Sequence, residues 1–342
     1  MTIHRIAIPW DGKKAGYTRP ICKKAINSQL GWKALEVDIQ KARRKEGDAK
    51  HAVTHHFAMA ELKKLANLHM VHKKKAHEPH RILKELLNPS KKELPYSYAL
   101  KQFVKESLYA FDDLSGLLLP GGDHICPYLY GAEFGKETAK HIQDMTAHRT
   151  ILELHLIDWF VSKRLPVLGI CRGAQMVNIY FGGSLKQRVV EQFHWTGPSE
   201  VTVKGGKNTF ASKAFGPKGS SAKTHSLHMQ AIDPEDIGGI LKATVKKGPI
   251  VKMIEGRLGD DKLPIIGTQF HPELWYKADM YGDANPIYQG KEIAFNKDLL
   301  DEGNDNILLM FLDLAKKYNK KRNDKLAKGA DLGQGDALEA PK

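Results

Sequence analysis

The strongest constraint on the fold comes from two short apolar runs that each lead into a turn. They are LSGLLLPGG at 114–122 and RLPVLGI at 164–170. An unbroken apolar run of this length is typical of a strand that is buried on both faces of a parallel sheet. The chain has 342 residues, of which 42% are hydrophobic, so it can bury such a sheet between helices.

Strand-like and helix-like segments alternate along the chain. We predict further strands at 3–10, 32–39, 201–205, 242–247, 250–256 and 264–270. We predict helices at 19–30, 100–111, 136–163, 174–182 and 303–320. This alternation predicts an α/β fold with three layers, helix–sheet–helix, around a mostly parallel central sheet. Functional groups of such sheets gather at the carboxyl ends of the strands, where Gly122, Cys171 and His271 are expected.

The segment from about 40 to 100 has helical periodicity and is rich in lysine and histidine. Residues 41–110 hold 16 Lys and Arg against 7 Asp and Glu, in a chain whose net charge is +14. We expect two or three helices there, separated near Pro79, Asn88-Pro89 and Pro95. We interpret the segment as a helical insertion in a single domain of residues 1–320. The polar remainder, 321–342, is predicted to be disordered.

The basic insertion leaves several partners open. It could attract a protein partner or an acidic substrate, and a solvated helix surface is the simpler alternative. Nucleic acid is disfavoured because the basic run lacks interleaved aromatic residues. His51, His55 and His56 have helical spacing for a metal, but a polar helix face explains them better, so we expect neither metal nor cofactor. A homodimer remains open.

Three widely spaced cysteines, Cys22, Cys126 and Cys171, indicate neither a disulfide framework nor a zinc knuckle. A reducing compartment is the natural expectation. The start of the chain has no long apolar region of the secretory type, and no run approaches 18 apolar residues. We therefore expect a cytoplasmic protein without a membrane span, or one delivered to another reducing compartment.

Cys171 has the surroundings of a nucleophile on a sharp strand-to-helix turn. In GICRG, glycines stand two residues before and two residues after the thiol, which allows strand and helix to approach closely. Backbone N–H groups at a helix start favour a thiolate over a thiol. A buried structural cysteine is the alternative interpretation.

The segment GTQFHPE at 267–273 contains the groups that a cysteine nucleophile needs. His271 and Glu273 are two residues apart and would project to one side of an extended segment, with Glu273 orienting His271 as a base. Acyl transfer also needs N–H donors for an oxyanion. The turn at Gly122 and the N–H of Arg172 are the candidates.

Together these three blocks resemble the class I glutamine amidotransferase superfamily, and in particular its peptidase C26 branch of the γ-glutamyl-γ-aminobutyrate hydrolase type. The resemblance covers about 1–39 and 100–320. Further matching positions of the chain are Pro127, Tyr130-Gly131, Arg149, Glu153 and the segments 182–187 and 226–230. The resemblance implies the flavodoxin-like fold of this superfamily.

The resemblance also implies roles for particular residues. Cys171 would be the nucleophile, His271 the base and Glu273 its orienting group, with oxyanion donors at Gly122 and Arg172. The residues expected near a γ-glutamyl group are Gln175, Ser226, His228 and Gln230. The implied reaction is cleavage of a γ-glutamyl amide or isopeptide through a thioester on Cys171. Its substrate would be a small γ-glutamyl compound or an acidic, polyglutamylated one.

The chain departs from the family pattern around the expected pocket. His124 and Cys126 stand at positions that are usually acidic, and Thr150 replaces an Asp. His225 and Met229 alter the block Asn-Ser-x-His-His-Gln. We therefore expect a different amine side of the substrate. Two other functions remain open, namely a glutaminase subunit that supplies ammonia to a separate synthetase and a binding or regulatory protein on this fold.

Overall fold

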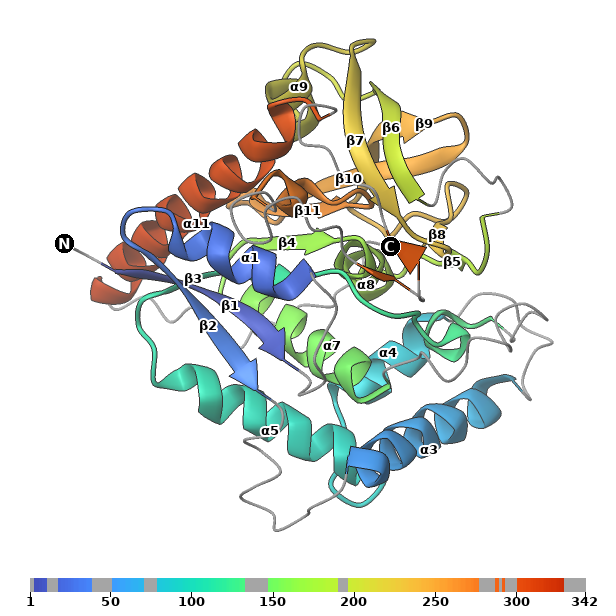
Figure 1. Cartoon of the computed structure of the whole chain (residues 1–342). Coiled ribbons are helices and arrows are strands. Elements are labelled where there is room, and N and C mark those ends of the chain that lie inside the picture. The colour runs from blue at the N-terminus through green and yellow to red at the C-terminus, as the bar shows by residue number, and fades with distance from the viewer. Residues whose placement is uncertain are drawn as a thin grey trace.

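The fold is built on a nine-stranded sheet with helices on both faces (Figure 1). A computed structural model describes residues 3–10, 18–38, 51–70, 79–132, 147–189, 196–276, 287–288, 291–292 and 300–328. The strand order is β2-β1-β3-β4-β11-β10-β9-β6-β7. The predicted α/β class with its mostly parallel central sheet is confirmed.

The first five strands of this order run parallel and form the central part of the sheet. They are β2 (Trp32–Asp38), β1 (His4–Trp10), β3 (Leu114–Leu119), β4 (Val167–Ile170) and β11 (Leu263–Thr268). Because neighbouring parallel strands end at the same edge, the residues after β3, β4 and β11 meet there. That edge carries the candidate site.

The other four strands extend the sheet with antiparallel pairings. They are β10 (Ile250–Leu258), β9 (Lys242–Lys247), β6 (Thr196–Val203) and β7 (Ser221–Leu227). Two small sheets pair β5 (Leu185–Lys186) with β8 (Ala231–Ile232) and β12 (Ile287–Tyr288) with β13 (Lys291–Glu292). The sequence did not predict β7 as a strand, although it carries part of the candidate pocket.

Alternate side chains of the central strands enter two separate cores. Leu117 and Leu119 of β3 lie in one core, and Leu118 between them lies in the other. This period of two explains why the strand is apolar throughout. The first core is covered by α7 (Ala147–Ser162) and α8 (Arg172–Tyr180) together with the helices of the 40–100 segment, and the second by α1 (Thr18–Asn27), α9 (Phe210–Phe215) and α11 (Gly303–Ala327).

In the segment predicted as an insertion, the structure has α3 (His51–Met70), α4 (Pro79–Leu87) and the start of α5 (Pro95–Tyr109). Their apolar side chains pack on the α7 side of the sheet, as Leu62, Leu86 and Leu100 illustrate. α3 and α4 also contact the short helix η1 (Pro127–Tyr130), which follows the Pro-Gly-Gly turn. The inserted helices therefore adjoin a loop of the candidate site.

A carboxylate ties two of these helices together. The backbone N–H groups of Tyr96 and Ser97, at the start of α5, donate to Glu61 of α3 at 2.7 and 3.0 Å. Burial raises the pKa of Glu61, against the opposing effect of these N–H groups. We expect Glu61→Ala to lower the free energy of unfolding by about 2 kcal/mol, because two N–H groups at a helix start lose their acceptor.

Urea unfolding monitored by circular dichroism measures this effect. Glu93→Ala is the matched control, because Glu93 is an exposed carboxylate next to the same helix, and its loss should change stability by less than about 0.5 kcal/mol. Equal effects of the two substitutions would contradict the proposed bond between α3 and α5.

The last helix is longer than predicted. α11 continues to Ala327 instead of ending at 320, because its final turns are anchored to the body of the protein. The Arg322 guanidinium donates to the Asp112 carbonyl at 2.9 Å, and the Lys325 ammonium lies 2.9 Å from the Asp261 carboxylate. The rest of the predicted tail, 329–342, lies outside the described residues, as does 136–146 of the predicted helix 136–163. No helix in the described ranges has the length and apolar character needed to cross a membrane.

Candidate active site

Cys171 occupies the sharp turn between β4 and α8. Its φ of 52° and ψ of −105° are unusual for a residue with a side chain. Such strain is typical of functional positions that the surrounding structure holds in place. Here the Cys171 N–H donates to the Thr268 carbonyl at 2.6 Å, and the Cys171 carbonyl accepts from the Gln175 N–H at 3.1 Å.

The two glycines around Cys171 are required by close packing. A Cβ on Gly169 would lie 2.4 Å from the Gly173 backbone, and a Cβ on Gly173 would lie 2.2 Å from the Leu119 carbonyl oxygen. Both neighbours are backbone atoms, which cannot move without displacing β3 or α8. The predicted reason for the spacing GICRG is therefore observed in the structure.

We expect Gly173→Ala to lower the free energy of unfolding by about 2 kcal/mol, because the added methyl group overlaps the β3 backbone. Chemical denaturation measures the change. Gly206→Ala is the control, since a Cβ at Gly206 meets no atom within 4 Å and should shift stability by less than about 0.5 kcal/mol. A stable Gly173→Ala protein would mean that the turn is not tightly packed.

His271 and Glu273 form a buried pair directly after β11. The His271 Nδ1 atom is 2.8 Å from a Glu273 carboxylate oxygen, and the His271 N–H donates to the His225 carbonyl at 2.9 Å. Both side chains are almost fully buried. Since Nδ1 faces a carboxylate, it carries the proton and donates it. The carboxylate thereby fixes the orientation and tautomer of the ring.

The electrostatics of His271 link it to both partners. Burial alone would lower the pKa of His271, but the negative charges of Glu273 and of a Cys171 thiolate, both of which accept hydrogen bonds from the ring, raise it well above its usual value. An imidazolium is therefore stabilised between these two groups. This arrangement is suited to a thiolate–imidazolium pair.

The Pro-Gly-Gly turn is held by a buried arginine. Arg149 of α7 donates to the carbonyls of Pro120 and Gly121 at 2.8 and 3.1 Å. A Cβ on Gly122 would lie 2.3 Å from the Arg149 guanidinium and would displace it from its bonds to the turn. The arginine thus fixes the backbone of the predicted oxyanion donor.

The same arginine belongs to a buried ionic network. Glu153 accepts from Arg149 at 2.6 Å and also pairs with the Arg172 guanidinium. Arg172 further donates to the Thr150 hydroxyl at 2.7 Å, and burial lowers the pKa of its guanidinium. One carboxylate therefore serves two buried cations, which join the turn at Gly122 to the residue after Cys171. The sequence predicted only the Arg172 N–H, not this side chain.

Three glutamines connect the segment 226–230 to the nucleophile. The Gln269 amide contacts the Cys171 sulfur at 3.6 Å and accepts from the Gln175 amide at 3.1 Å. Gln175 also donates to the Gln230 carbonyl at 2.7 Å. The Gln230 side chain pairs with both backbone groups of Ile125, at 2.8 and 2.9 Å.

The other two predicted pocket residues meet a lysine that the sequence analysis missed. Ser226 and His228 both bond to Lys252 of β10, and the Leu227 carbonyl between them lies 3.4 Å from the Cys171 sulfur. The available signal was a lysine inside the otherwise apolar segment IVKMI. A charged residue in a buried strand is rarely tolerated without a partner or a role.

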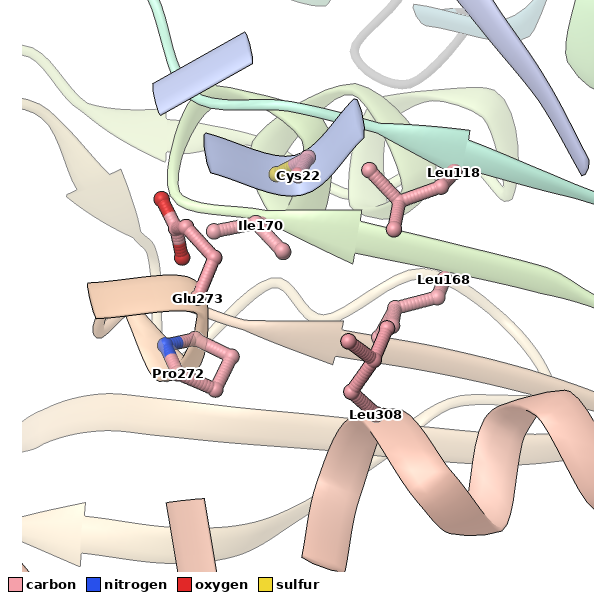
Figure 2. A pocket seen from close by; sticks show the side chains of 7 residues that line it. All are labelled: Cys22, Leu118, Leu168, Ile170, Pro272, Glu273 and Leu308. Carbon is pink, nitrogen blue, oxygen red and sulfur yellow. The ribbon is translucent and has the colours of Figure 1, made fainter. Parts of the chain in front are cut away.

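A crevice lies beside Glu273 (Figure 2). Its lining comes from Cys22, Leu118, Leu168, Ile170, Pro272, Glu273 and Leu308. The walls are apolar apart from the Glu273 carboxyl group and the Cys22 thiol, so the carboxylate sits in a poorly solvated environment. Burial, together with the Glu273 charge, raises the pKa of Cys22 well above its usual value. Burial and the nearby carboxylate therefore keep Cys22 as a thiol.

The candidate site lies within a range of the chain that matches a known protein family. The family model described as Peptidase C26 matches residues 94–273, a range that contains the cysteine turn and the His-Pro-Glu segment. The match begins at α5 and leaves α3 and α4 outside it.

Two relatives and one solved structure illustrate the similarity. A Schizosaccharomyces pombe protein named "Putative glutamine amidotransferase PB2B2.05" is 34% identical over 175 residues, which are 47% of this chain and 62% of that protein. Gamma-glutamyl-gamma-aminobutyrate hydrolase PuuD of Escherichia coli is 33% identical over 100 residues, 29% of this chain and 36% of that protein. The chain thus spans less than two thirds of the length of these relatives. A Thermoplasma acidophilum structure named as a "putative gmp synthase subunit a protein" aligns over 94% of this chain and 99% of that chain, at 14% identity and a TM-score of 0.48.

Proposed function

Because the chain belongs to the Peptidase C26 family, we propose that it is a glutamine-amidotransferase-like cysteine hydrolase that cleaves γ-glutamyl amide or isopeptide bonds. The observation that carries this proposal is the arrangement of Cys171 and His271. The cysteine is held at a strained turn, and the histidine interacts with it while bonded to Glu273 at 2.8 Å. Nucleophile, base and orienting group are thus all present.

In the first half of the reaction, the Cys171 thiolate attacks the γ-carbonyl carbon of the substrate. The carbonyl electrons move onto the oxygen, which the N–H groups of Gly122 and Arg172 stabilise. The imidazolium of His271 then gives its proton to the leaving amine as the C–N bond breaks. A γ-glutamyl thioester on Cys171 and a free amine result.

In the second half, His271 accepts a proton from water, and the resulting hydroxide attacks the thioester. The C–S bond breaks and returns the thiolate, and the new γ-carboxyl group of glutamate releases its proton to solvent as the product leaves. Glu273 stabilises the imidazolium in both halves through the Nδ1 proton and need not be protonated itself.

The test is a substrate panel with purified full-length protein. It contains glutamine, γ-glutamyl dipeptides, γ-glutamyl amines and a poly-γ-glutamyl chain, and glutamate and amine release are measured by mass spectrometry. We expect at least one γ-glutamyl compound to be hydrolysed, with a transient adduct on Cys171. Absence of both turnover and adduct across the panel would reject the proposed chemistry.

A second candidate is a glutaminase subunit that supplies ammonia to a separate synthetase. The S. pombe relative is named a "putative glutamine amidotransferase", which favours this candidate. The same panel separates the candidates, because a free-standing hydrolase acts alone. Glutamine hydrolysis that appears only after a synthetase partner is added would favour the glutaminase subunit.

The inserted helices bear on the choice of substrate. Lys63 and Lys64 of α3 and Lys91 and Lys92 after α4 belong to the strongly basic 41–110 segment, and α3 and α4 contact η1. The positive charge of these helices would attract an acidic substrate over a long range. We therefore include the poly-γ-glutamyl chain and expect its hydrolysis to slow as salt concentration rises.

A further inference from the structure

Lys252 is a buried lysine close to the nucleophile. It lies in β10, next to β11, and its side chain is fully buried. The Gln269 N–H donates to the Lys252 carbonyl at 2.8 Å, so the lysine stands beside the glutamine whose amide contacts the Cys171 sulfur. Burying an ammonium costs considerable free energy unless other groups compensate for it.

The two side chains on either side of Leu227 in the sequence accept hydrogen bonds from this lysine. The Lys252 ammonium lies 2.9 Å from the Ser226 hydroxyl and 2.9 Å from His228 Nε2. His228 Nδ1 is 3.1 Å from the Gln230 carbonyl, so the ring proton is on Nδ1 and Nε2 is the acceptor. The lysine therefore holds His228 as a neutral ring in one tautomer.

The residue between these two acceptors contacts the nucleophile. In its thiol form, Cys171 donates to the Leu227 carbonyl oxygen, which lies 3.4 Å from the sulfur. Because Lys252 bonds to the side chains on either side of Leu227, it fixes this carbonyl against the sulfur. The segment 226–228 thus links the lysine and the cysteine through neighbouring residues.

The charges of the two groups are coupled as well. Burial, with a smaller contribution from Lys247, lowers the pKa of Lys252 to about 7, and a Cys171 thiolate opposes this shift. Coupling between two charged sites acts in both directions. A positive charge at Lys252 and a negative charge at Cys171 consequently stabilise one another.

From this geometry we infer that Lys252 is a positioning residue, which holds the segment 226–228 against Cys171 and supplies positive charge to the nucleophile. The inference rests on the proposed role of Cys171 and deepens it. A site with this charge favours acyl donors that carry a negative group near the scissile carbonyl, as a γ-glutamyl group with its α-carboxylate does.

Alkylation of Cys171 tests the inference without any γ-glutamyl substrate. The rates of modification by neutral iodoacetamide and by anionic iodoacetate are measured by peptide mass mapping at about pH 6, where Lys252, with a pKa of about 7, carries its charge. The ratio of the two rates reports the local charge. Cys22 and Cys126 are even more deeply buried than Cys171, with exposed fractions of 0% and 1% against 5%, and burial raises the pKa of both thiols, to about 11 for Cys126, so they serve as slow internal references. Thermal unfolding checks that each variant is folded.

The variants separate charge from shape. Lys252→Gln keeps a hydrogen-bond donor and removes the charge, Lys252→Met removes both, and Lys252→Arg keeps the charge. Lys242→Met, on the exposed side of the neighbouring strand β9, is the matched control. If Lys252→Met fails to fold, Lys252→Gln decides.

We expect Lys252→Gln to slow alkylation of Cys171 about fivefold or more and to lower the iodoacetate-to-iodoacetamide ratio about threefold. Lys252→Arg should restore most of the ratio, and Lys242→Met should leave both quantities unchanged. An unchanged ratio in folded Lys252→Gln protein would overturn the inference, as would a wild-type Cys171 that does not alkylate. Because no substrate is involved, a failed γ-glutamyl panel rejects the proposed function and leaves this result standing.

Discussion

Replacement of Cys171 with alanine is expected to reduce γ-glutamyl hydrolysis by at least about 1,000-fold, because no other group can form the thioester. The substituted protein should remain folded. Cys171 is small and buried, and the substitution removes only its sulfur atom. The strained backbone of the turn stays bonded to the Thr268 carbonyl. The measurement is the rate of glutamate release from the best substrate of the panel.

Cys22→Ala is the matched control for this experiment. It removes a second buried thiol, which is no part of the proposed chemistry, and should change the rate by less than about threefold. A Cys171→Ala protein that retains substantial hydrolysis would reject the cysteine mechanism. A wild-type protein that binds a protein partner tightly, yet turns over nothing on the panel, would favour the binding or regulatory alternative.

Glu153→Gln is expected to lower the free energy of unfolding by about 3 kcal/mol or more. The substitution leaves the guanidinium groups of Arg149 and Arg172 buried without their shared carboxylate. Removing one member of a buried ionic network exposes the full desolvation cost of the charges that remain. Urea unfolding at neutral pH measures the change.

The same substitution should impair catalysis under conditions where the protein is still folded. Arg149 fixes the carbonyls of Pro120 and Gly121, and Arg172 follows the nucleophile, so both proposed oxyanion donors depend on Glu153. We expect the turnover number to fall more than the substrate affinity, since oxyanion contacts strengthen only in the transition state.

Asp261→Asn is the control for the stability measurement. Asp261 also pairs with two cations, Lys321 and Lys325, but the three side chains are partly exposed to solvent. Such pairs contribute at most about 1 kcal/mol. If the exposed and the buried substitutions destabilise the protein equally, Glu153 is not the shared anion of a desolvated network.

Much of the central sheet could be predicted from local sequence. The segments 114–122 and 164–170 are apolar without interruption because their side chains enter both cores, and this pattern is visible in the sequence itself. β7 was missed for the opposite reason. Its first four residues alternate between exposed and buried positions, and the next two buried residues, His225 and Ser226, are polar, so no apolar run marks it.

The candidate site shows the same division. Cys171 and the pair His271 and Glu273 were identifiable because their motifs are short and local. Lys252 was not, because nothing near it in sequence indicates what it bonds. Its partners lie 24 and 26 residues away along the chain and reach it only through the folding of the sheet.

The sequence by itself thus determined which residues carry the chemistry and where the chain must turn. Glycine spacing around Cys171 and the His-Pro-Glu segment are local properties, since close backbone approach and side-chain reach over two residues need no distant partner. Only the tertiary structure decided how these groups are supported. Three features depend on contacts between distant segments: the carboxylate shared by Arg149 and Arg172, the bonds of Lys252 to the segment 226–228, and the extension of α11. These contacts, together with burial, determine the free energy of keeping each charged group in the folded protein.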